Sequence, residues 1–115
     1  MTDLEQVEIQ IDVAQKLRSL RDNCVKLKNN EFFKDVIEEG YFKEEAARLV
    51  MTKSSNLSPE QMAIIDRMIF GVGALHNYLE GVMRRGAEMD LAIGEHEQTR
   101  EEILAEEIKV WIQPP

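Results

Sequence analysis

Two short segments contain residue types that bind cofactors or metals in other proteins. Phe70-Gly71-Val72-Gly73 is similar to the start of a phosphate-binding turn. A dinucleotide-binding turn, however, has a third glycine at the position of His76 and follows a strand. His96-Glu97-Gln98-Thr99-Arg100 begins like a zinc-protease helix, but Arg100 replaces the second histidine, so no tetrahedral zinc site follows. The sequence therefore predicts neither a cofactor nor a bound metal.

Nucleophiles and paired acids also give no catalytic arrangement. Cys24 is the only cysteine and lies on an apolar helical stripe, which indicates a buried hydrophobic side chain rather than a nucleophile. Adjacent glutamates such as Glu101 and Glu102 point about 100° apart on a helix and do not converge on a substrate. No serine, histidine and acid have a spacing that suggests a catalytic triad. We therefore predict that the protein is not an enzyme.

The composition indicates a folded, helical protein. Of its 115 residues, 43% are hydrophobic and 31% are charged, which is too apolar for a disordered chain. A chain of this length forms one domain with a small core, so oligomerisation would add stability. Abundant Glu, Leu, Ala, Met, Lys and Arg favour α-helix. The single cysteine and the lack of a signal peptide or long apolar run lead us to expect a reducing compartment and no membrane span.

The charges are unevenly distributed along the chain. The net charge of −8 argues against direct nucleic-acid binding, because such binding neutralises phosphates with basic residues. Residues 16–34 carry six bases against Asp22 and Glu31, a balance of +4. Residues 88–107 carry eight acids against Arg100, a balance of −7. We expect these two segments to attract each other, either within a subunit or between subunits.

The first part of the chain is predicted to form a helix over about 4–28. An apolar seam repeats there at alternating steps of four and three, which is a heptad pattern: Val13, Leu17, Leu20, Cys24 and Leu27. Asn29 and Asn30 end this helix and offer a cap to the next one.

Four aromatic residues surround Gly40 in the segment that follows. Because glycine commonly ends a helix, we expect Gly40 to separate helices over 30–39 and 41–52. We interpret this region as a corner rather than a binding pocket, since no converging polar groups accompany the aromatics. Tyr41, next to the glycine, is a candidate partner contact. The other three aromatics are expected to fill the end of a helical hairpin: Phe32, Phe33 and Phe42.

Ser58-Pro59-Glu60-Gln61 predicts the start of a long helix over 59–93. Serine at the N-cap and glutamine three residues later form a capping box, and proline occupies the first helical position. A seam of this length is typical of coiled coils and long helical hairpins. It alternates steps of three and four through nine positions: Ile65, Met68, Val72, Leu75, Leu79, Val82, Gly86, Met89 and Ile93.

Five glycines lie within this helical pattern, and each costs about 1 kcal/mol relative to alanine. We expect Gly71 and Gly86 to allow close packing between helices, and we expect a break near Gly94. A separate acidic helix is predicted over 95–107. Three of its acids are candidate contacts for a basic partner: Glu101, Glu102 and Glu106.

Both ends of the chain alternate between apolar and polar residues, which is a strand pattern. The alternation covers residues 7–13 and recurs at 108–112 in the tail 108–115. These segments could pair with each other as a short β ribbon, or one could add to a neighbouring molecule as an arm. Trp111, the only tryptophan, is a candidate intermolecular contact.

Three helical phrases resemble small helical proteins of tailed bacteriophages. They are FFKDVIEEGYFKEEAARLV, AIIDRMIFGVGALHNYL and EHEQTREEILAEE, within residues 13–107. The resemblance implies a non-enzymatic virion component or assembly factor encoded among virion-structure genes. It supplies no site residues, and the two ends of the chain lie outside it.

We therefore expect an all-α protein with one domain over 1–115, a long helical hairpin or bundle that is oligomeric. The expected function is that of a non-enzymatic phage virion or assembly protein. It would associate with itself and dock on other virion proteins, in the virion or the host cytoplasm. The alternative is an acidic phage effector that binds and inhibits a host nucleic-acid enzyme.

Overall fold

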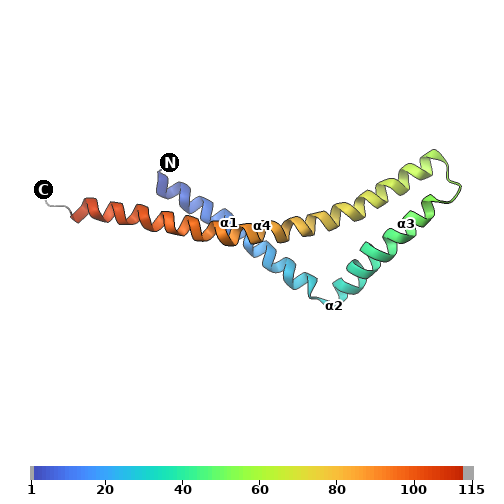
Figure 1. The fold of residues 1–115 in the computed structure, drawn as a ribbon, viewed down its shortest axis with the longest axis horizontal. Helices are drawn as coiled ribbons and strands as arrows, with labels where there is room; N and C mark the ends of the chain where they lie inside the picture. The colour runs from blue at the N-terminus through green and yellow to red at the C-terminus, as the bar shows by residue number, and fades with distance from the viewer. Residues whose placement is uncertain (1, 113–115) are drawn as a thin grey trace. The chain divides into compact units, whose positions relative to one another are not determined.

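The chain is almost entirely helical in the part that the computed structural model describes, residues 2–112 (Figure 1). Helix α1 spans Asp3–Lys28, and helix α4 spans Pro59–Ile112. Between them lies one uninterrupted helical run, made of α2 (Glu31–Phe33), the π-helical segment η1 (Lys34–Glu45) and α3 (Ala46–Lys53). Because no strand occurs among residues 2–112, the predicted all-α fold is confirmed.

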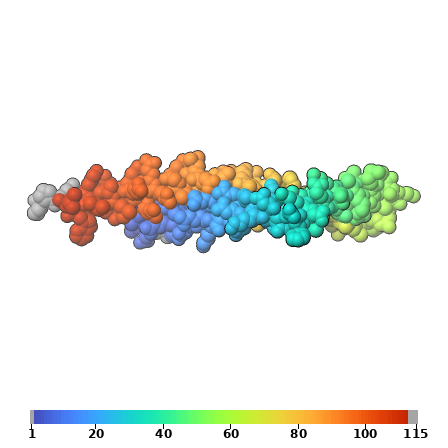
Figure 2. Space-filling view, turned by 90° about the horizontal axis from the view of Figure 1, so that it is seen from below, coloured from blue at the N-terminus to red at the C-terminus, as the bar shows by residue number. Residues whose placement is uncertain are grey.

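The contacts divide the chain into two compact units. The first unit contains residues 1–22 and 82–115, so it combines the first part of α1 with the second half of α4. Both Figure 1 and Figure 2 show these two helical segments side by side. The second unit contains residues 23–81, which comprise the end of α1, the run from α2 to α3 and the first part of α4.

Helix α1 has the predicted bounds, and Cys24 of the predicted seam is buried as expected, but in the first unit the helix buries a different face. Val7, Ile11 and Ala14 are buried in the first unit, with Ala14 only 2% exposed. Val13 and Leu20 of the predicted seam are instead 53% and 42% exposed. The alternating N-terminal segment belongs to this helix, so the alternative of a β ribbon with the C-terminal segment does not occur among the described residues. Alternation over 7–13 also places residues four apart on one helical face, and this spacing is the one that the fold uses.

The chain turns at Asn29 and Asn30, and not at Gly40. Asn30 Oδ1 accepts hydrogen bonds from the backbone N–H groups of Phe32 (2.9 Å) and Phe33 (3.1 Å), which is the cap expected from the sequence. Gly40 lies inside η1 with a helical backbone, so the predicted corner at Gly40 is wrong. The cost of one helical glycine, about 1 kcal/mol, is small enough for neighbouring helix-forming residues to offset.

The lack of a side chain at Gly40 suits the wide turn of η1. A Cβ atom built on Gly40 would lie 3.2 Å from the carbonyl oxygen of Asp35, five residues earlier. Segments with i→i+5 hydrogen bonds are rare, and this one is longer than the single-turn bulges that are most common. Phe32 is largely exposed, so the expected filling of a corner by this residue is wrong.

The capping box at the start of α4 forms as predicted. The Ser58 N–H donates to Gln61 Oε1 at 3.0 Å, and the Gln61 N–H donates to Ser58 Oγ at 3.2 Å. These two bonds satisfy backbone groups that a helix start leaves without partners. The polar loop before the box, residues 54–58, connects α3 to α4.

Replacing Ser58 by alanine is expected to lower the free energy of unfolding by about 1 kcal/mol, because the Gln61 N–H loses its acceptor. Urea unfolding followed by circular dichroism measures the change. Ser55→Ala, in the same loop, is the matched control. Among the described residues, Ser55 forms a hydrogen bond through its backbone N–H, which the substitution keeps, and none through its hydroxyl. Equal losses in the two variants would contradict a specific contribution from the cap.

Helix α4 continues without a break to Ile112. The predicted break near Gly94 is therefore wrong, and so is the separation into helices over 59–93 and 95–107. Ile93 is buried in the first unit, which holds the helix in place beside this glycine. Residues 108–112 are also helical and form no β ribbon, because extending an existing helix requires no new nucleus. Residues 113–115 of the predicted tail lie outside the described part.

Candidate interaction sites

Gly86 is a point of close approach between α1 and α4 in the first unit. A Cβ atom built on Gly86 would lie 2.1 Å from Cβ and 2.3 Å from Cγ of Arg21. Real Cβ atoms do not approach other atoms so closely, so no side chain fits here without a shift of the helices. The predicted close packing is confirmed at Gly86.

Gly71 has a different environment in the second unit. A Cβ atom built there would have its nearest neighbour at 3.7 Å, the Tyr41 hydroxyl oxygen, which is an ordinary contact distance. Packing within the unit therefore does not require glycine at this position. A role for Gly71 or Tyr41 in contacting a partner stays a prediction.

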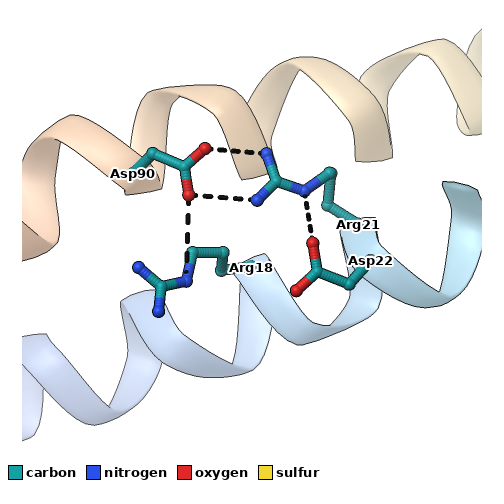
Figure 3. Close-up of polar contacts among 4 residues, drawn as sticks. All are labelled: Arg18, Arg21, Asp22 and Asp90. Carbon is teal, nitrogen blue, oxygen red and sulfur yellow. Dashed lines mark hydrogen bonds and ion pairs between the residues drawn. The ribbon is translucent and has the colours of Figure 1, made fainter.

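The Arg21 side chain of α1 lies against Gly86 of α4. Its guanidinium reaches Asp90, which is also on α4 (Figure 3). Its Nη1 donates to Asp90 Oδ2 at 2.9 Å, and its Nη2 donates to Asp90 Oδ1 at 3.0 Å. Arg21 Nε also donates to Asp22 Oδ1 at 2.8 Å, and Arg18 Nε lies 3.8 Å from Asp90 Oδ1. The planar guanidinium matches both carboxylate oxygens, and such bidentate pairs are stronger and more directional than single ion pairs.

These contacts change the proton affinity of the groups involved. The hydrogen bond from Arg21 lowers the pKa of Asp90 below its usual value, and the positive charges of Arg21 and Arg18 act in the same direction. The hydrogen bond to Asp90, followed by that to Asp22, raises the pKa of Arg21. The expected attraction between the basic and acidic segments thus occurs within the subunit, and Asp90 is the acid that forms ion pairs with both arginines.

A line of apolar residues remains exposed on the side of α1 that faces away from its buried side. Ile9, Val13 and Leu20 are 48%, 53% and 42% exposed, and Leu17 between them is half-buried. We call these four residues the α1 outer stripe. They include three residues of the predicted heptad seam. Within the first unit, this part of the seam therefore lies on a face of α1 that the rest of the unit leaves largely uncovered.

The second unit contains a small cavity between its helices. Phe42 and His76 meet edge to face with ring centroids 5.2 Å apart, and the cavity beside them has a volume of about 340 Å³. Lys28 Nζ at its rim lies 3.6 Å from Glu80 Oε1, and Lys43 Nζ lies 2.8 Å from Glu39 Oε1. Sequence reasoning missed this pairing of Phe42 with His76, because no local pattern links residues so far apart in the chain. The cavity lining thus combines one histidine with two lysines, and both lysines are paired with carboxylates.

The candidate contacts near the C-terminus lie on an exposed part of α4. Glu102 accepts a hydrogen bond from Gln98 Nε2 at 3.3 Å, and Glu106 pairs with Lys109 at 3.3 Å, while Glu101 is exposed. Trp111 is 87% exposed. The last turns of α4 also expose four further apolar side chains: Leu104, Ile108, Val110 and Ile112.

One end of the first unit is strongly acidic. Residues 3–12 of α1 contain four acids and no base, a balance of −4. Residues 95–107 of α4 contain six acids against Arg100, a balance of −5. We call these two segments together the acidic end. From the sequence, only the α4 acids were predicted to contact a partner. The α1 acids lie beside them because of how the two helices pair, which the sequence did not reveal.

Within residues 2–112, no three His, Cys, Asp or Glu side chains are grouped closely enough to hold a metal ion. None of the helices in this described range combines the length and the apolar character that crossing a bilayer requires. No protein-family model, curated protein or solved structure matches the chain.

Proposed function

We propose that the protein is a non-enzymatic assembly protein that associates through its helices with copies of itself and then docks on other proteins of a phage virion. The observation that carries the proposal is the α1 outer stripe. Single exposed apolar residues are common on monomeric proteins, but a line of them at helical spacing is typical of a surface that pairs with another helix.

Two other features support the proposal. The core of a chain this small is limited, so association would bury apolar surface that folding alone leaves in water. The exposed apolar residues at the end of α4, with Trp111 among them, offer a second surface for docking on a larger complex. The virion setting is supported by the resemblance of the helical phrases to proteins of tailed bacteriophages.

The proposal predicts that the purified protein has a mass above its monomer value of 13.3 kDa at micromolar concentration. Light scattering coupled to size-exclusion chromatography measures this mass. Mass spectrometry of purified virions tests whether the chain belongs to the particle. A monomer in solution together with absence from virions would contradict the proposal.

The acidic end favours a second candidate function, inhibition of a host nucleic-acid enzyme by a protein that presents a row of negative charges. Affinity capture distinguishes the two candidates when it is carried out with virion proteins and with host lysate. Capture of a DNA- or RNA-binding enzyme at low salt, lost at high salt, would favour the inhibitor. Capture of virion proteins would favour the assembly protein.

A further inference from the structure

The charges on α1 divide the helix into two halves of opposite sign. Its first ten residues, 3–12, carry a balance of −4. The next part within the first unit, residues 16–22, contains three bases and Asp22, a balance of +2. The outer stripe runs across this boundary, with Ile9 in the acidic half and Leu20 in the basic half.

Two of the charges lie beside the outer stripe itself. At 100° per residue, Asp12 and Lys16 fall on the same side of α1 as Ile9 and Leu20. Arg18 and Arg21 are directed to Asp90, but Lys16 forms no ion pair with any residue in the described part of the chain. With Ile9, Val13 and Leu20 of the stripe, Lys16 forms a heptad spacing at positions 9, 13, 16 and 20, and a single lysine at a seam position specifies register.

We propose that the α1 outer stripe binds the same stripe of a second copy, with the two α1 helices antiparallel about a two-fold axis. This inference rests on the self-association proposed above and names its surface and geometry. Ile9 of one copy packs on Leu20 of the partner subunit, and Asp12 lies beside Lys16 of the partner subunit. The reciprocal contacts follow from the two-fold symmetry.

The charges beside the stripe select both the occupant and the direction. An antiparallel pair places Asp12 of each α1 beside Lys16 of the other, whereas a parallel pair would place each of these two charges beside its like. The stripe and its flanking charges are therefore complementary to themselves. A partner helix of a single charge sign would be repelled by either Asp12 or Lys16.

Exchange of Asp12 and Lys16 tests the geometry through the dissociation constant measured by analytical ultracentrifugation. Lys16→Glu and Asp12→Lys are each expected to weaken association by about tenfold, because each places like charges together across the pair. The double variant Asp12→Lys/Lys16→Glu is expected to return to within about threefold of the original value. Circular dichroism of each variant checks that the helical content is unchanged.

Leu20→Lys is expected to abolish association, and Leu91→Lys is the matched control, since Leu91 is an exposed apolar residue of the same unit outside the stripe. Association that resists Leu20→Lys would overturn the α1 surface while leaving self-association in place. Association that Leu20→Lys abolishes, but that the double variant does not restore, would overturn the antiparallel arrangement. A monomeric original protein would overturn both this inference and the proposed self-association.

Discussion

Gly86→Ala is expected to destabilise the protein, although alanine forms helix better than glycine. The added methyl group would occupy the position now 2.1 Å from Arg21 Cβ, so α1 and α4 must move apart. Overpacking costs about 1–3 kcal/mol, and the gain in helix propensity is about 1 kcal/mol. Because the clash is with the stem of Arg21 near its backbone, we expect a net loss of about 2 kcal/mol in the free energy of unfolding.

Gly94→Ala, on the same helix and in the same unit, is the matched control. A Cβ atom at this position would have no neighbour within 4 Å, so the substitution is expected to stabilise the protein by about 0.5–1 kcal/mol. Urea unfolding followed by circular dichroism gives both values. The two alanine variants thus have opposite expected signs, and stabilisation by both would mean that the helices do not approach each other at Gly86.

Asp90→Arg is expected to lower the urea midpoint at neutral pH, because it places a third guanidinium beside Arg18 and Arg21. Glu95→Arg is the matched control, since it changes the net charge by the same amount on the same helix. Glu95 belongs to the acidic end, so its reversal relieves repulsion and the midpoint is expected to stay unchanged or to rise. Equal decreases in both variants would show that net charge, and not the contact with the arginines, determines the loss.

The same contact predicts a pH dependence whose sign follows from the lowered pKa of Asp90. A carboxylate with a lower pKa in the folded state stabilises the fold above its unfolded pKa of about 4, and this contribution disappears as the pH falls through the folded value. The difference in unfolding free energy between the original protein and Asp90→Asn should therefore be constant from pH 7 to about 5 and should narrow below about pH 4. A difference that persists unchanged to low pH would exclude the ionised pair as its source.

Local signals in the sequence predicted the helix boundaries where a side chain satisfies the backbone. Ser58 with Gln61 and Asn30 with its two acceptor bonds are of this kind, because both partners lie within three residues of each other. Gly40 and Gly94 were predicted to interrupt helices and do not. A penalty of about 1 kcal/mol is smaller than the gain from packing and from cooperative helix extension, and neither can be read from one residue.

The face that α1 buries could not be predicted from the helix alone. It carries two apolar stripes, one with Val7, Ile11 and Ala14 and the other with Ile9, Val13 and Leu20. Both have helical spacing, and Val13 and Leu20 of the second also belong to the longer heptad seam that continues to Leu27. The choice between them depends on Gly86 and Asp90, and Asp90 lies 69 residues from Arg21 in the sequence. The sequence therefore indicated Gly86 and the charge imbalance at this crossing, but it did not indicate which residues contact each other there.

Dissolved salt has two opposite effects on the helix pair of the first unit, because attraction acts at the crossing and repulsion acts at the acidic end. At the crossing, ions screen the attraction between Arg21 and Asp90. At the acidic end, a shell of counter-ions relieves the mutual repulsion of residues 3–12 and 95–107. As ionic strength rises, the contact between Arg21 and Asp90 is thus weakened, while the pairing of the two acidic segments is stabilised. The stability of the helix pair therefore depends on the dissolved ions as well as on its own residues.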